Sequence, residues 1–452
     1  HSSFFILHSS FFILHSSFFI LHSSFKMTST YILQHRHEDP RRLALQSHPE
    51  GVDMKYALEQ IAGWQAARHK IPGWAETEGI IYPPHISMEQ CSSQSTAIYK
   101  RSVAARLLGD GAESMVDLTG GYGVDFSYIA REFRRAVYVE RQKVLCTTAR
   151  HNLPLLGLDR AEVVCGDGVE YLRSMDHVSM VFLDPARRDS NGGRTYGIAD
   201  CTPDVMAIAP LLRAKADVVM IKLSPMLDFH KVLEDLHGVS EIHIVSVKNE
   251  CKDLLVVIDN RRNGADGAGD GGSMAAPDTT PDTEIYCVNC LDADGQASAV
   301  SFSMAEAQDD MLSDEAPAGG APRYADPQQG QYLYEPNASV MKAGHLGMAM
   351  VSRKYGAMQV APNSNLFVSP SHIASFPGRQ FCIRAVTGMN KKELRQALSS
   401  TDKANITTRN FPLSVADLRK RLKLKDGGAT YIFATTLRDG SHKLLVCETA
   451  KV

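Results

Sequence analysis

The fold is decided by the segment Val116-Asp117-Leu118-Thr119-Gly120-Gly121-Tyr122-Gly123 of this 452-residue chain. An apolar run precedes the segment and a helix-like stretch follows it, so its glycines occupy a strand-to-helix turn. Glycine lets the backbone adopt positive φ and approach a ligand closely. In open α/β sheets, ligands bind where the strand order reverses. The turn is therefore a predicted ligand site. Its candidate contacts are Asp117, Thr119, Gly120, Gly121, Gly123 and Asp125.

Short apolar runs alternate with helix-like segments on the carboxyl side of this turn. The predicted strands are 114–118, 136–139, 161–165, 178–183 and 218–223, and the predicted helices are 126–133, 144–152, 169–175, 202–212 and 227–236. This alternation predicts a parallel sheet with helices on both faces. Two more strands, 242–247 and 254–258, have only a short link between them and predict a closing antiparallel hairpin. We therefore predict a doubly wound, Rossmann-like α/β domain over residues 113–262.

Acidic residues stand at the ends of successive predicted strands. Glu140 ends the second strand, where a carboxylate can accept hydrogen bonds from two ribose hydroxyls. Asp167-Gly168 follows the third strand, and a carboxylate there can accept from an adenine amino group. Asp184-Pro185-Ala186-Arg187-Arg188 follows the fourth. Each acid alone could be a helix cap or a solvated loop residue. Together with Asp117 at the end of the first strand, however, four acids in this order favour one cofactor site.

Together these elements resemble the motifs of class I S-adenosylmethionine-dependent methyltransferases. The resemblance implies that S-adenosyl-L-methionine is the cofactor, with its methionine part at the glycine turn. The closing hairpin is similar to the antiparallel seventh strand of that family. The Asp184 segment is similar to the D/N-P-P-Y/F motif of nucleobase methyltransferases, with Ala186 and Arg187 in place of the last two residues. It implies catalytic roles for Asp184, Pro185 and Arg187.

The same segment is also similar to the D-P-P-R of RNA uridine C5-methyltransferases, which use a cysteine nucleophile after the fifth strand. This chain has Lys222-Leu223-Ser224-Pro225 there, and Cys251 comes too late in the order. We therefore expect direct transfer, with Asp184 orienting the acceptor or taking its proton. Lys222 is a further catalytic candidate, through phosphate contact or charge steering; a structural surface lysine is the alternative.

The layout from Met27 onward is similar to bacterial methyltransferases that carry a C-terminal THUMP-like domain. The similarity rests on Glu89-Gln90-Cys91-Ser92-Ser93, the DLTGGYGVD turn, DPARR, and segments 407–413 and 424–428. It implies a helical region at 27–112, a linker with a ferredoxin-like α+β domain at 263–375, and a THUMP-like βαβαββ module at 376–452. THUMP modules bind tRNA, so it also implies an RNA substrate, tRNA or rRNA.

Net charge is only −3, so charge supports nucleic-acid binding only locally. The C-terminal module is basic, which favours phosphate contact, although a solvated helix face is the plainer alternative. Its basic residues include Lys391, Lys392, Arg395, Lys403, Arg409, Arg419, Lys420, Arg421, Lys423 and Lys425. Alternative functions are a small-molecule or protein methyltransferase, a non-catalytic RNA-binding protein with a relic pocket, and a nicotinamide dehydrogenase, which the glycine spacing disfavours.

The first 26 residues repeat HSSFFIL and are interpreted as upstream or non-native sequence. Nine scattered cysteines favour free thiols in a reducing compartment. The pair Cys287 and Cys290 lacks a second pair at zinc spacing, so no metal is expected. Because no membrane or targeting segment is recognised, a cytoplasmic protein without membrane partners is expected. The modified base and atom, the oligomeric state, and any site role of Gln94 or Tyr99 stay open.

Overall fold

The computed structural model describes residues 26–47, 49–83, 85–187, 197–263, 282–291, 295–307, 323–399 and 401–450. The repeat at 1–25, Arg188 and most of the predicted linker, residues 264–281, lie outside these residues. The chain forms two compact units. The first holds His1–Ala186, Ile208–Val219 and Asp292–Gln296, and the second holds Arg187–Ala207, Met220–Leu291 and Ala297–Val452. In the described ranges, every helix is too short or too polar to cross a membrane.

The first unit is built on a sheet whose strands follow the order β7-β4-β1-β2-β3. These strands are β1 (Ser114–Asp117), β2 (Arg135–Glu140), β3 (Glu162–Cys165), β4 (Val178–Leu183) and β7 (Ala216–Leu223, continuing into the second unit after Val219). β1 is parallel to β2 and β4, and β2 is parallel to β3. β1, β2 and β4 are buried along nearly their whole length, as expected for a parallel sheet covered on both faces.

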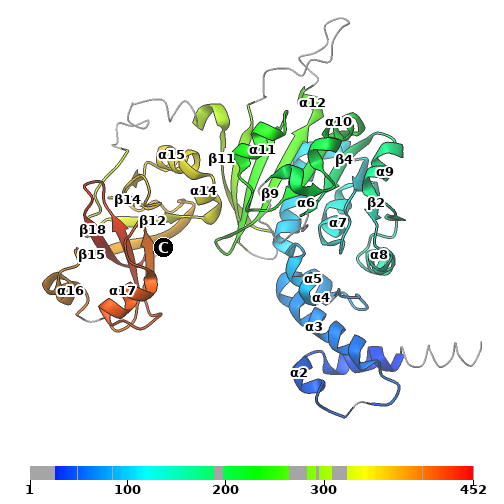
Figure 1. The fold of residues 1–452 in the computed structure, drawn as a ribbon, viewed down its shortest axis with the longest axis horizontal. Helices are drawn as coiled ribbons and strands as arrows, with labels where there is room; N and C mark the ends of the chain where they lie inside the picture. The colour runs from blue at the N-terminus through cyan, green and yellow to red at the C-terminus, as the bar shows by residue number, and fades with distance from the viewer. Residues whose placement is uncertain are drawn as a thin grey trace, which may run out of the picture. The chain divides into compact units, whose positions relative to one another are not determined.

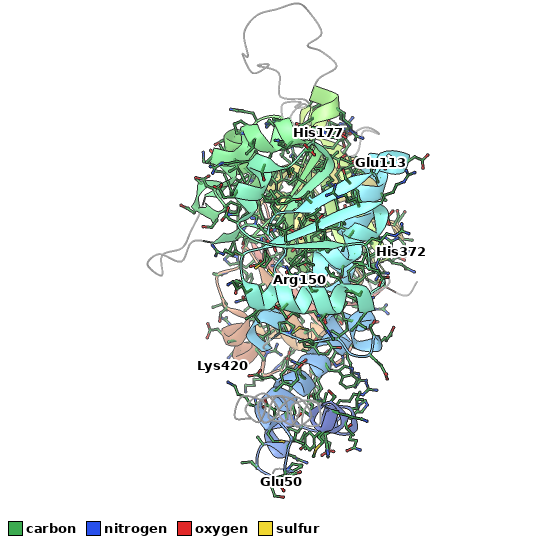
Figure 2. The ribbon with its side chains drawn as sticks, turned by 90° about the vertical axis from the view of Figure 1, so that its right-hand side faces the viewer. Glu50, Glu113, Arg150, His177, His372 and Lys420 are labelled. Carbon is green, nitrogen blue, oxygen red and sulfur yellow. The ribbon has the colours of Figure 1, made fainter. Side chains whose placement is uncertain are left out.

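The strand order reverses between β1 and β4, because the chain runs outward to β3 before it returns beside β1. The helices between the strands are α7 (Val124–Ile129), α8 (Lys143–Leu155), α9 (Gly168–Ser174) and α10 (Val205–Lys215). α8 carries Arg150 (Figure 2), and this side chain donates to the carbonyl of Val163 in β3. The reversal places the carboxyl ends of β1 and β4 next to each other, where doubly wound sheets bind ligands.

The N-terminal helices pack against α7 and share its core, except for the first of them, which packs on the second in a separate buried cluster. They are α2 (Pro40–Leu43), α3 (Met54–Lys70), α4 (Pro72–Glu76), α5 (His85–Gln90) and α6 (Gln94–Leu108). Trp64, Trp74 and Tyr82 form one buried cluster with Val124 and Tyr128 of α7. α6 runs alongside α7 (Figure 1). The helical lead-in is therefore part of the first unit.

The second unit contains the order β11-β10-β8-β9-β7. After α11 (Phe229–Asp235), β8 (Glu241–Val247) and β9 (Glu250–Asp259) form the predicted antiparallel hairpin. Lys248 and Asn249 link them with φ of 50° and 61°, as a two-residue type I′ turn requires. The short helix α12 (Asn260–Asn263) follows.

The next two strands differ from expectation, because the sequence pattern placed them beyond a linker, in a middle unit. β10 (Glu284–Cys290) lies parallel to β8, and β11 (Ala297–Ser303) pairs with β10 in antiparallel fashion. They thus extend the sheet of the hairpin. β8 is buried along six of its seven residues, so a further strand is needed to pair the edge that β9 leaves open.

A second sheet of seven strands has the order β13-β14-β12-β15-β18-β17-β16. Its elements are β12 (Tyr332–Pro336), α14 (Ala338–Lys342), α15 (Gly344–Tyr355), β13 (Met358–Gln359), β14 (Phe367–Ser369), β15 (Gly378–Thr387), α16 (Lys391–Ala397), β16 (Asn405–Arg409), α17 (Val415–Leu422), β17 (Thr430–Thr436) and β18 (His442–Thr449). From β15 onward the order is the predicted βαβαββ. β12 pairs with β15, so the two small C-terminal regions share one sheet.

This sheet is strongly curved. Glu335 of β12 is fully buried and forms ion pairs with Arg379 of β15 and, at 2.7 Å, with Arg409 of β16. β12 and β16 are four steps apart in strand order, which is about 19 Å across a flat sheet. An arginine cannot span that distance. The face that carries Glu335 is therefore concave, and a core that includes Phe381 and Phe433 fills it.

Candidate functional site

The glycine turn after β1 has the backbone that the sequence predicts. Gly121 and Gly123 have φ of 56° and 77°, in the left-handed region that favours glycine. Gly120 is required for another reason, because a Cβ there would overlap the ring of Tyr138. The Tyr138 hydroxyl also donates to the carbonyl of Gly121. The buried tyrosine thus supports the turn from β2.

Asp117 and Asp184 are linked through Thr119. The Thr119 amide donates to Asp117 Oδ1 at 2.9 Å, and its hydroxyl donates to the same oxygen at 3.4 Å. The hydroxyl also accepts from the Asp184 amide at 2.6 Å. Asp117 is only 2% exposed, and burial raises its pKa to about 8. The negative charges of Asp125 and Asp184 contribute to this raised pKa, while the hydrogen bonds from Thr119 oppose it.

Glu140 connects the end of β2 to the glycine turn. Its Oε2 accepts from the Gly121 amide at 3.0 Å, and its Oε1 accepts from the Gln142 amide at 2.8 Å. Each carboxylate oxygen has a second lone pair for a further donor. The carboxylate is therefore held rigidly and keeps acceptor capacity for two hydroxyl groups.

Asp167 begins α9. Its Oδ1 accepts from the amides of Val169 and Glu170 at 2.9 and 3.1 Å. This oxygen therefore caps the helix, which was the alternative interpretation of the residue. The residue is exposed. Gly168 packs closely against the end of β1, because a Cβ there would overlap the Leu118 carbonyl oxygen. This contact holds the loop after β3 beside the glycine turn.

The remaining catalytic candidates lie near strand ends. Asp184 is half-buried and Pro185 is buried, directly after β4. Arg187 is the second residue of the short strand β5 (Ala186–Arg187), which pairs with β6 (Cys201–Thr202). Lys222 is half-buried and is the penultimate residue of β7. The structure thus brings the glycine turn, Asp117, Thr119, Glu140 and Asp184 into one bonded group.

Asp125 belongs to a different set of contacts. Its Oδ1 pairs with Lys100 Nζ at 2.9 Å, and its Oδ2 accepts from the Ser92 hydroxyl at 2.7 Å. Lys100 also donates to Ser92 at 3.1 Å. Sequence reasoning missed Lys100 and Ser92; the available signal was the concentration of polar residues just before and within a helix. Gln94 supports the same interface, since its Oε1 accepts from Tyr128.

Metal binding has no support in the described ranges, which contain no group of three or more His, Cys, Asp or Glu residues able to hold an ion. Cys287 and Cys290 both lie buried in β10.

The strand order, the reversal beside β1, the glycine turn and the β8–β9 hairpin define the class of the protein as a class I, Rossmann-like methyltransferase fold. Comparison with known proteins agrees. The crystal structure of a candidate methyltransferase from Porphyromonas gingivalis W83 is 31% identical, with a TM-score of 0.76, over 94% of this chain and 98% of that one.

The chain is also similar to two kinds of curated methyltransferase. An uncharacterized S-adenosylmethionine-dependent methyltransferase from Mycobacterium tuberculosis is 26% identical over 366 residues, which cover 78% of this chain and 85% of that protein. A protein-L-isoaspartate O-methyltransferase from Nitrobacter winogradskyi is 28% identical over 134 residues, covering 29% of this chain and 60% of that protein.

Family models match the C-terminal part. Residues 332–377 match a ferredoxin-like domain, and residues 378–449 match a THUMP domain-like family. The chain therefore belongs to the S-adenosylmethionine-dependent methyltransferases that carry a THUMP-like domain, and S-adenosylmethionine is its cofactor.

Proposed function

We propose that this protein methylates a base in RNA, tRNA or rRNA, by direct transfer from S-adenosylmethionine. The observation that carries the proposal is the link from Asp117 through Thr119 to Asp184, which joins a cofactor motif to an acceptor motif at the strand reversal. The proposed cofactor contacts are Asp117, Thr119, Gly120, Gly121, Gly123, Glu140, Asp167 and Gly168. Asp125 supports the turn from behind, since both of its carboxylate oxygens are engaged by Lys100 and Ser92.

The residues at the turn fit this cofactor. Burial makes ionised Asp117 costly, and a ligand with ammonium and sulfonium charges would lower that cost. Glu140 keeps acceptor capacity for the ribose hydroxyls, and the second carboxylate oxygen of Asp167 is proposed to accept from the adenine amino group. The open backbone at Gly121 allows close approach of the methionine part.

The chemistry that the bound cofactor supplies is a methyl group on a reactive sulfonium. The protein then has to position the acceptor and exclude water. Thr119 fixes the Asp184 backbone, so the Asp184 carboxylate can orient the acceptor atom or take the proton of that atom. Buried Pro185 holds the segment rigid, while Arg187 and Lys222 are proposed to contact phosphate. Ser224-Pro225 after β7 supplies no cysteine for a covalent route.

The basic surface of the THUMP-like module supports RNA as the substrate. Arg409 and Arg419 are engaged with Glu335 and Asp426. The other eight cations are exposed and, within the described part of the chain, make no ion pair. They are Lys391, Lys392, Arg395, Lys403, Lys420, Arg421, Lys423 and Lys425. Figure 2 shows Lys420 at the surface.

These cations gather on one side of the sheet. α16 and α17 pack onto the same core cluster, through residues that include Leu394 and Leu418. A backbone bridge also places Lys403 beside Lys425. Like charges held side by side destabilise the protein unless an anion lies between them. An RNA backbone is a suitable anion for such a surface.

The test is transfer of a tritiated methyl group from S-adenosylmethionine to RNA prepared from cells that lack this gene. The wild-type protein should label one nucleoside, and Asp184→Ala should lower the rate at least about a hundredfold. Lys420→Glu with Arg421→Glu should weaken RNA binding but leave cofactor binding unchanged. Label that enters protein or a small molecule instead would establish the alternative function.

A further inference from the structure

A lysine is buried in the lead-in, where α6 packs against α7. Lys100 of α6 is 1% exposed, and its ammonium lies against Asp125 at 2.9 Å and Ser92 at 3.1 Å. Buried lysines are rare, because the charge loses its hydration, and they persist only where partners compensate. Ser92, Lys100 and Asp125 form a closed triangle of contacts, and we call them the lysine triangle.

The lysine triangle acts on the cofactor turn through the backbone. Asp125 is the second residue of α7, which begins directly after Gly123. The Gly123 amide donates to the Gly120 carbonyl, and the Ser127 amide donates to the Gly123 carbonyl, at 2.9 and 2.8 Å. The glycine turn and the first turn of α7 therefore form one bonded stretch. Fixing the Asp125 side chain fixes the orientation of that stretch.

The charge of Lys100 also belongs to the electrostatics of the site. The carboxylates of Asp125 and Asp184 both disfavour a negative charge on Asp117, and Lys100 is the cation that pairs with Asp125. Without Lys100, the carboxylate of Asp125 would stay buried but lose the cation that compensates its charge. The helix start would then be expected to move toward water, taking the turn with it.

We propose that Lys100 is a positioning residue for the cofactor, holding the glycine turn in its binding conformation through the ion pair with Asp125. The proposal rests on the proposed cofactor site at this turn. It gives the N-terminal lead-in a defined role: α6 completes the cofactor site from behind, although none of its residues belongs to the methyltransferase motifs.

A matched control lies on the same interface. The Trp74 indole donates to the Ser127 hydroxyl at 3.2 Å, two residues further along α7 than Asp125. Trp74→Phe should therefore lower the melting temperature while leaving the turn in place. Lys100→Met removes the positioning charge, and Lys100→Arg keeps it.

The experiment measures binding of S-adenosylhomocysteine to the full chain by calorimetry, with the melting temperature as the stability control. Lys100→Met should weaken binding at least about tenfold, because small displacements of a positioned site are costly. Lys100→Arg and Trp74→Phe should bind within about threefold of wild type. Binding by folded Lys100→Met within twofold of wild type overturns the proposal, as does equal weakening by Trp74→Phe.

Two further measurements cover the remaining outcomes. If Lys100→Met does not fold, Ser92→Ala removes one donor to Asp125 more gently, and unchanged binding and stability would then overturn the proposal. Amide hydrogen exchange without ligand tests the turn itself: Lys100→Arg should leave residues 120–125 as protected as in wild type, and Ser92→Ala should expose them. A wild-type protein that binds no S-adenosylhomocysteine, yet shows this exchange pattern, refutes the proposed cofactor site and leaves the positioning contact standing.

Discussion

Cofactor binding should release a proton from Asp117. This carboxyl is buried, and its burial together with the nearby charges of Asp125 and Asp184 raises its pKa to about 8. A ligand with an ammonium group stabilises the ionised form, so binding and deprotonation are coupled. Asp117→Asn keeps the acceptor oxygen for the Thr119 amide and removes the titration. It is therefore the matched perturbation.

The size of the effect follows from that pKa. Below about pH 8, the ionised fraction falls about tenfold per pH unit, so the affinity should fall by up to about 1.4 kcal/mol per unit toward pH 6. At pH 7 the free protein holds about 0.9 proton on this group, and binding should release up to that amount. The folded pKa lies above the unfolded one. The stability contribution of Asp117 therefore decreases as pH rises from about 4 to about 8.

The assay is calorimetry of S-adenosylhomocysteine binding at pH 6, 7 and 8, in two buffers with different ionisation enthalpies. The enthalpy difference between buffers counts the protons released. The ammonium of the ligand titrates with both proteins, so subtracting the Asp117→Asn value isolates Asp117. Equal proton counts for the two proteins, or an affinity that does not depend on pH below 8, would refute the reasoning.

Three further predictions concern other parts of the molecule. Gly168→Ala should weaken S-adenosylhomocysteine binding at least about tenfold by calorimetry, because the new Cβ overlaps the Leu118 carbonyl. The control is Gly166→Ala, which should bind normally because a Cβ at residue 166 meets open space. Glu335→Gln should lower the free energy of unfolding by about 2–3 kcal/mol in urea titrations. The loss should be smaller than for a fully buried pair, because the two arginine partners of Glu335 are 45% and 31% exposed. A loss under about 0.5 kcal/mol, the size of an ordinary surface effect, would contradict this prediction. Lys420→Ala should reduce the slope of log RNA affinity against log salt by about 0.9, and an unchanged slope would remove this lysine from the RNA surface.

The methyltransferase sheet could be predicted because its signals are local. β4 was predicted at its observed bounds, since an apolar run ends at Asp184-Pro185. The glycine turn was predictable because residue type alone reports positive φ at Gly121 and Gly123. The Ser414 cap of α17 follows from the same local rules.

The features that could not be predicted depend on contacts between distant residues. Lys100 and Asp125 are 25 residues apart, and only the packing of α6 on α7 brings them together. Strand periodicity does not predict which strands pair, so it could not predict the pairing of β10 with β8. It also could not predict the sheet curvature that brings Glu335 to Arg409. Asp167 was ambiguous for a related reason, because a helix cap and a cofactor contact require the same residue type at the same place.

The central claim is methylation of an RNA base, and the nucleosides of cellular RNA test it most directly. Mass spectrometry would compare RNA from cells that carry this gene, cells that lack it, and deletion cells complemented with Asp184→Ala. The account predicts one methylated nucleoside that is lost on deletion, restored by the wild-type gene and not restored by the variant. An identical set of methylated nucleosides in all three RNA samples would contradict it.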